Sequence, residues 1–207
     1  MIDTLLIDQG GVIVDLDRSR CIAALKALGM EDPDRLIGLY EQSGPFLQLE
    51  SGLIDKHQFH EIMRPYFPEG VTTDQIDEAF SSFIVGIPQS RLVALRELRK
   101  RFKLYILSNT NPIMFEGVLA REFSQEGFTA GDYFDGIILS YEAKSCKPDR
   151  KIFDYAVERF GIVPENTLLI DDGRDNIMAA RNLGFHGLLI PEGQEFDEVL
   201  TKYLSGK

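Results

Sequence analysis

The chain has 207 residues, of which 44% are hydrophobic and 27% are charged, a composition typical of a soluble globular protein that can bury one full core. The formal net charge of −11 repels nucleic acids and anionic membranes, so we expect neither as a partner. No stretch approaches the roughly 20 apolar residues of a membrane-spanning helix, and the N-terminus lacks the pattern of a secretory signal. The two cysteines, Cys21 and Cys146, match no metal-ligand spacing and indicate a reducing compartment, so we expect a cytoplasmic protein.

Short apolar runs alternate with helical patterns along most of the chain. The strand-like runs lie at 4–7, 103–107 and 167–170, with weaker ones at 136–139 and 187–190. Continuous apolar runs, rather than alternating ones, are typical of strands that helices cover on both faces. The helical patterns between them start at prolines such as Pro88 and Pro148 and stop at glycines such as Gly161. This alternation predicts an α/β fold with a parallel sheet and right-handed crossovers.

The stretch from about 18 to 85 differs, because it contains helical patterns and no strand-like run. These patterns lie at 18–29, 33–43, 56–67 and 73–84. We predict an all-helical cap, residues 17–85, inserted after the first strand of an α/β core that comprises 1–16 and 86–207. Its hinges are expected near 16–18 and 84–88.

Two further features of this stretch have plain structural interpretations. Gly52 is expected to form a turn or to end a helix. His57 and His60 share one helix face, and we expect an ordinary helix surface there rather than a metal-binding pair.

Polar side chains follow three of the predicted strands, at the point where each strand ends. Asp8 follows the first, residues 108–111 follow the second, and residues 171–176 follow the late one. The carboxyl ends of parallel strands near a switch point form a ligand crevice, so we expect these clusters to converge. Lys147, just before Pro148 at a predicted helix start, adds a cation where anions are already attracted.

The acidic residues of this crevice indicate a metal site. Asp8, Asp171 and Asp172 would repel one another strongly unless a divalent cation neutralised them. A set of hard oxygen ligands without His or Cys favours Mg²⁺ over zinc. With Lys147 as a second cation and the Ser108 hydroxyl as a donor, this is the set that phosphoryl transfer needs. An aspartate can then be the nucleophile, through an aspartyl-phosphate that water hydrolyses.

Four segments, "IDQGGVIVD", "LSNTN", "CKP" and "IDDGRDN", resemble in this order the motifs of the haloacid dehalogenase superfamily. The resemblance is to its phosphatases with a helical cap after the first strand, and it covers essentially the whole chain. It implies a Rossmann-like core, with Asp8 as nucleophile and Mg²⁺ ligand. It also implies that the backbone carbonyl of Gly10 and the side chain of Asp172 are ligands, with Asp171 ligating or lying just behind the ligands.

The resemblance assigns further roles in binding phosphate. Ser108 and Asn109 would bind the transferring phosphoryl group, and Lys147 would neutralise it. Asp175 stands where the family often places another acid that orients the lysine or the metal-bound waters. The implied substrate is a small phosphorylated metabolite. A likeness to a bacterial branch that includes glucose-1-phosphate phosphatases makes a sugar phosphate such as glucose 1-phosphate a candidate.

The Gly10-Gly11 pair lets the backbone turn close to metal and phosphate, but Gly10 departs from the family pattern. Most of these phosphatases carry at that position an aspartate that protonates the leaving oxygen, a group that contributes about 10²–10⁴-fold. Three interpretations stay open. The branch works without this acid because a sugar 1-phosphate has a better leaving group; another acid, from the cap or from Asp15 or Asp17, replaces it; or the protein is a catalytically weak phospholigand-binding or regulatory protein.

Other members of the superfamily and one other fold fit the sequence less well. Dehalogenases have little use for a metal and usually lack the acidic pair that residues 171–172 provide. Phosphonatases need a cap lysine that forms a Schiff base, and the candidates here are Lys26 and Lys56. The helical pattern around Lys26 predicts a residue on the solvent-exposed face. Receiver-type signalling domains carry their acidic pair after the first strand and their phosphorylated aspartate after a later one, which is the reverse of the order here.

Overall fold

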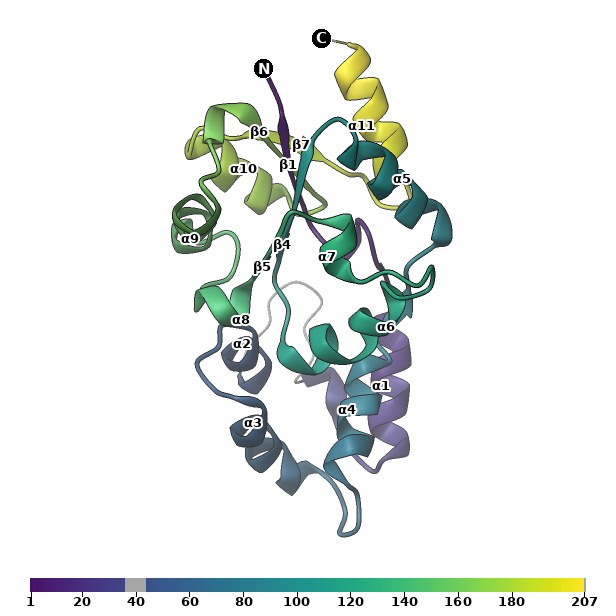
Figure 1. Cartoon of the computed structure of the whole chain (residues 1–207). Coiled ribbons are helices and arrows are strands. Elements are labelled where there is room, and N and C mark those ends of the chain that lie inside the picture. The colour runs from purple at the N-terminus through teal and green to yellow at the C-terminus, as the bar shows by residue number, and fades with distance from the viewer. Residues whose placement is uncertain (36–43, 207) are drawn as a thin grey trace.

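The computed structural model describes residues 1–35 and 44–206. Its centre is a parallel sheet of five strands in the order β5-β4-β1-β6-β7 (Figure 1). The strands are β1 (Thr4–Ile7), β4 (Lys103–Ser108), β5 (Gly136–Leu139), β6 (Thr167–Asp171) and β7 (His186–Leu189). Each coincides with a predicted apolar run to within one residue, so the predicted parallel α/β sheet is confirmed. Because β1 is central, the carboxyl ends of β4 and β6 flank its own.

Helices cover both faces of the sheet, as predicted (Figure 1). Successive side chains of a strand point to opposite faces. On β1, Leu5 and Ile7 therefore join an apolar cluster with α5, α7 and α11, whereas Leu6 joins another with α9 and α10. These helices are α5 (Gln89–Arg99), α7 (Ala130–Tyr133), α9 (Arg150–Phe160), α10 (Arg174–Asn182) and α11 (Phe196–Ser205), with short helical segments at Met114–Leu119, α6 (Ala120–Glu122), α8 (Ser140–Ala143) and Pro164–Asn166. Among the residues that the structure describes, no helix is both long enough and apolar enough to cross a membrane.

A separate group of helices lies beyond the carboxyl ends of the strands (Figure 1). It consists of α1 (Arg18–Ala27), α2 (Pro45–Glu50), α3 (Lys56–Met63) and α4 (Thr73–Ser81), with single turns at Pro33–Arg35 and Arg64–Tyr66. These helices pack around their own apolar cluster, in which the rings of Phe46, Phe59 and Phe80 meet edge to face with centroids 4.5–5.4 Å apart. Most of the helix predicted at 33–43 falls outside the described residues.

The connection between the two parts differs from the prediction. A two-stranded antiparallel ribbon joins β2 (Asp15–Leu16) to β3 (Ile84–Gly86), where the sequence predicted helix up to residue 84. Strands of two and three residues are too short to show a periodic pattern, so their pairing could not be read from the sequence. The ribbon lies at the predicted hinges, and the predicted boundary at 85/86 falls inside β3. The division into core and cap stays a prediction.

The turn after α2 follows the sequence prediction. Gly52 adopts φ +60°, and its N–H donates to the Leu49 carbonyl at 3.0 Å. A Cβ atom at this position would overlap with the Tyr141 carbonyl of α8, so the turn needs glycine for its conformation and for its contact with the core.

Candidate active site

The three predicted clusters meet at the carboxyl edge of the sheet. Asp8 directly follows β1, Ser108 ends β4 and Asp171 ends β6. Carboxylate oxygens of Asp8, Asp171 and Asp172 all lie within 4.8 Å of one another. The backbone fixes this arrangement, since the Asp8 N–H donates to the Ile170 carbonyl of the neighbouring strand at 2.9 Å.

A buried lysine lies between two of these carboxylates. The Lys147 Nζ atom is 2.8 Å from Asp8 Oδ1 and 2.7 Å from Asp171 Oδ2, and the side chain is only 1% exposed. Asn109 fixes the backbone of this lysine: its Oδ1 accepts from the Lys147 N–H at 2.7 Å and its Nδ2 donates to the Lys147 carbonyl at 2.9 Å. The Asn109 side chain thus holds the backbone of Lys147, and the assignment of Asn109 to the phosphoryl group stays a prediction.

The two adjacent aspartates occupy different environments. Asp171 is fully buried, and its Oδ1 accepts from the Gly173 N–H at 2.7 Å and from Asn176 Nδ2 at 2.9 Å, while its Oδ2 accepts from Lys147. Asp172 is exposed toward the crevice. Asp175 is an exposed residue in the first turn of α10, and it is Asn176 that contacts Asp171. Sequence reasoning missed Asn176, although an amide in the first turn after the acidic pair was a readable signal.

The loop after Asp8 folds tightly against the acidic pair. The Gln9 carbonyl accepts from the N–H groups of Ile13 at 2.9 Å and Val14 at 2.8 Å. Gly11 adopts φ +72°, and a Cβ atom there would overlap with the Asp172 carboxylate. This position therefore requires glycine for two reasons, its backbone conformation and the close approach of Asp172.

The electrostatics of the cluster favour an added cation. Burial, opposed by Lys147 and assisted by the carboxylates of Asp171 and Asp172, raises the pKa of Asp8 to about 7. Burial also raises the pKa of Asp172, with Asp171 adding to the effect. For Lys147, burial lowers the pKa, but the charges of Asp171 and Asp8 outweigh it and raise the pKa overall. One ammonium group among three carboxylates leaves an excess of negative charge that a divalent cation would neutralise.

The two carboxylates considered as replacements for the missing acid have other partners. Asp17 caps α1, accepting from the N–H of Ser19 at 2.8 Å and from its hydroxyl at 2.6 Å. The Ser19 hydroxyl bond in particular lowers the pKa of Asp17, which makes it a poor proton donor at neutral pH. Asp15 Oδ1 is 2.7 Å from the guanidinium of Arg91. Neither residue is arranged as a general acid.

The histidines and lysines of the helical part do not converge on the carboxylates. His60 Nε2 is 2.6 Å from Asp77 Oδ1, whereas the side chain of His57 is 81% exposed, so the two do not form a metal-binding pair. Lys56 pairs with the same Asp77 at 2.6 Å, and Lys26 pairs with Asp34 at 3.2 Å. Neither lysine is free to act as a Schiff-base nucleophile in this arrangement.

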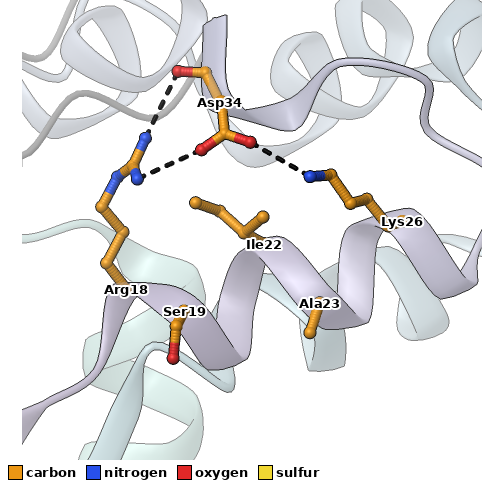
Figure 2. A pocket seen from close by; sticks show the side chains of 6 residues that line it. All are labelled: Arg18, Ser19, Ile22, Ala23, Lys26 and Asp34. Carbon is orange, nitrogen blue, oxygen red and sulfur yellow. Dashed lines mark hydrogen bonds and ion pairs between the residues drawn. The ribbon is translucent and has the colours of Figure 1, made fainter.

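A hollow of about 540 Å³ lies away from the carboxylates, on the surface of α1 (Figure 2). Among the residues that the structure describes, its lining comes from α1 and the turn at Pro33–Arg35, and Arg18 and Lys26 both lie 3.2 Å from Asp34 across it. Because these charges are paired with one another, the hollow offers no group for the chemistry of the crevice.

A second hollow, of about 450 Å³, lies between the helical part and the core. Residues between Leu49 and Gln58 line one side, and Pro112, Tyr141 and Lys144 line the other. Its lining residues Pro112 and Lys144 lie in the segments that follow Ser108 and precede Lys147, and Lys144 Nζ donates across its edge to the Gly52 carbonyl at 2.8 Å. This hollow is therefore the better placed of the two for a substrate.

The close approach of Gly11 and Asp172 can be tested by comparing two glycines. Gly193 has a similar φ of +75°, but a Cβ atom there would meet nothing within 4 Å. Gly193→Ala should lower the free energy of unfolding by about 1–2 kcal/mol, because alanine disfavours the left-handed backbone. Gly11→Ala should lower the free energy of unfolding, measured in urea, by clearly more than Gly193→Ala does, because it also displaces Asp172. Equal losses in the two variants would contradict the close approach.

Comparisons with known proteins agree with this geometry. A family model described as haloacid dehalogenase-like hydrolase matches residues 2–184. A D-ribitol-5-phosphate phosphatase of Bacteroides thetaiotaomicron is 34% identical over 205 residues, which cover 99% of this chain and 100% of that protein. A crystal structure of a haloacid dehalogenase family enzyme from the same organism, in complex with magnesium and inorganic phosphate, superposes with a TM-score of 0.90 at 38% identity, covering 96% of this chain and 99% of that one.

A further solved structure, a predicted hydrolase of this family from Porphyromonas gingivalis, has a TM-score of 0.89 at 31% identity and covers 99% of this chain and 98% of its own. The family model, the relatives and the arrangement of Asp8, Lys147 and the acidic pair agree. The chain belongs to the haloacid dehalogenase-like hydrolase family and is a hydrolase.

Proposed function

We propose that this hydrolase is a Mg²⁺-dependent phosphatase that cleaves a small phosphorylated metabolite through an aspartyl-phosphate at Asp8. The observation that carries the proposal is the buried ammonium of Lys147, held 2.8 Å from Asp8, beside a carboxylate cluster that needs a divalent cation. The relatives support it, since one is named as a sugar-alcohol phosphatase and another was solved with magnesium and phosphate.

The donor set fits magnesium. The carboxylates of Asp8 and Asp172 and the backbone carbonyl of Gly10 are hard oxygen donors, which Mg²⁺ prefers. Gly11 leaves the space that Asp172 needs beside them. Asp171 lies behind these donors and fixes Lys147. When bound, the ion would offset the charge of the carboxylates and of the phosphate oxygens.

The reaction that fits this arrangement has two displacements at phosphorus. A carboxylate oxygen of Asp8 attacks the phosphorus, the new P–O bond forms as the bond to the substrate oxygen breaks, and the substrate oxygen leaves as an alkoxide that takes a proton from water. Water then attacks the same phosphorus and releases phosphate and free Asp8. The ammonium of Lys147 and the Ser108 hydroxyl stabilise the negative charge on the transferring group.

We further propose that the helical segment 17–85 closes over this site as a cap. Its loop after α2 already contacts the core, where Ser51 Oγ lies 3.5 Å from Cys146 Sγ and the Gly52 carbonyl accepts from Lys144. Closure would exclude bulk water and let the hollow at this junction select the substrate.

For the substrate, we propose a phosphorylated polyol or sugar. The name of the ribitol-phosphate relative favours a primary phosphate ester of this class over glucose 1-phosphate. A primary alkyl phosphate has a poor leaving group. For such a substrate, a good leaving group cannot explain why the acid is missing at Gly10. A weakly catalytic phospholigand-binding protein is therefore the second candidate, and Gly10 is the observation that favours it.

Asp8→Asn should abolish phosphate release from p-nitrophenyl phosphate, ribitol 5-phosphate and glucose 1-phosphate, because the neutral amide is a poor nucleophile. Phosphate is measured colorimetrically with Mg²⁺ present, and EDTA should abolish release as well. Asp34→Asn, which removes an exposed carboxylate on the helical part, serves as the matched control and should keep wild-type rates. Turnover that survives in the Asp8 variant would disprove the nucleophile assignment.

Magnesium affinity should depend on pH through Asp8. In the metal-free protein the pKa of Asp8 is about 7, so below pH 7 the ion must displace a proton. The association constant measured by calorimetry should rise about tenfold per pH unit below pH 7 and level off above it. Asp8→Asn should reduce this slope to the part that Asp172 contributes, because the pKa of Asp172 is also raised. A wild-type affinity that stays constant between pH 5.5 and 8 would contradict the prediction.

Gly10→Asp should restore the missing general acid. A Cβ atom at Gly10 would lie 2.9 Å from Leu16 Cδ1, the movable end of a side chain, so the variant is best made together with Leu16→Ala. Turnover of ribitol 5-phosphate should then rise by up to about 10²-fold, with little change for p-nitrophenyl phosphate, whose leaving group needs no proton.

Gly10→Asn with Leu16→Ala is the control, since it has the same size without an ionisable proton. If turnover of ribitol 5-phosphate rises equally in both variants, or in neither, then the absence of an acid at Gly10 does not limit catalysis.

A further inference from the structure

We propose that Arg91 is a positioning residue. It holds in place the ribbon strand β2 and the loop of residues 9–14 after Asp8, which we call the catalytic loop. The inference rests on the proposed phosphatase function, because the loop in question carries the Gly10 carbonyl and follows the nucleophile. Arg91 lies in the first turn of α5 and is buried.

The guanidinium of Arg91 joins three parts of the chain that are far apart in sequence. Its Nη1 donates to the Ile13 carbonyl at 3.2 Å and to Asp15 Oδ1 at 2.7 Å. Its Nε and Nη2 donate to the two carboxylate oxygens of Glu195, the residue just before α11, at 2.8 and 3.0 Å. A planar fork bound on both edges has little freedom to rotate or shift, so the groups on its Nη1 side are held in a fixed place.

The groups held on that side belong to the catalytic loop and to β2. Ile13 lies in the loop that folds back on the Gln9 carbonyl, directly after Asp8. Asp15 and Leu16 form β2, and the Leu16 side chain occupies the space beside Gly10. Arg91 therefore fixes the far end of the segment whose near end carries the nucleophile and a proposed metal ligand.

The contacts favour positioning over global stability as the main role. A buried arginine with carboxylate partners contributes little net stability, because its desolvation offsets the attraction. The side chains of Asp15 and Glu195 are 49% and 44% exposed, so both can be hydrated again when the arginine is removed. The geometry of the loop is more sensitive, since a displacement of about 1 Å at reacting groups can reduce the rate about 10²-fold.

The test compares Arg91→Met with Arg96→Met. Arg96 lies on the same helix, and its contacts with Glu126 at 3.1 Å and with the Phe128 ring do not involve the catalytic loop. Arg91→Met should lower kcat about 10- to 100-fold with KM changed less than about threefold, whereas Arg96→Met should keep both. Arg91→Lys should fail to restore kcat, because an ammonium group cannot reproduce the fork.

Hydrogen exchange supplies a readout that does not depend on activity. Amides of residues 10–17 should exchange faster in Arg91→Met than in wild type, while the strands of the sheet should be unchanged. Asp15→Asn should reproduce part of the loss, and adding it to Arg91→Met should cause no further loss, since the two residues act through one contact. Additive losses would contradict the proposed coupling.

Wild-type kcat and wild-type exchange in Arg91→Met would overturn the proposal. So would a fall in kcat accompanied by faster exchange throughout the sheet, because that pattern indicates general destabilisation. If wild type releases no phosphate from any substrate, the proposed function is wrong, and the exchange of residues 10–17 still decides whether Arg91 positions the loop.

Discussion

The site depends on the buried ammonium group of Lys147. This group joins the carboxyl ends of β1 and β6 through Asp8 and Asp171, and the amide of Asn109, which follows β4, holds its backbone. Three neighbouring strands are thus tied to one side chain. Without it, Asp8 and Asp171 would lose the positive charge that contacts both of them, and burial would strengthen their mutual repulsion.

Much of the fold and of the acidic cluster could be predicted from the sequence. The strand ends were readable because buried parallel strands are continuous apolar runs, and polar side chains that follow such runs must meet at one edge of the sheet. Asp8 and the pair at 171–172 were found in this way, and Lys147 was found from its place before Pro148 at a predicted helix start. Their chemistry follows from residue type, since carboxylates in one crevice require a cation whatever the details of the loops.

The features that the sequence did not reveal rest on contacts between distant residues. Nothing local in Asp15 or Glu195 indicates that both bind Arg91, and the pairing of β2 with β3 involves too few residues for a pattern. The resemblance assigned Asn109 to the phosphoryl group and gave no sign that its side chain bonds to both backbone groups of Lys147. Such contacts are decided by which loops lie side by side, a property of the folded chain and not of any one segment.

The burial of Lys147 also has a consequence for covalent labelling. Amine-selective reagents need an accessible, unprotonated nitrogen, and the two carboxylates raise the pKa of a lysine whose side chain is almost fully enclosed. Surface lysines such as Lys100, which is 66% exposed, would react long before it. The Lys147 ammonium is thereby shielded from acylation and glycation in a protein that we propose to handle sugar phosphates.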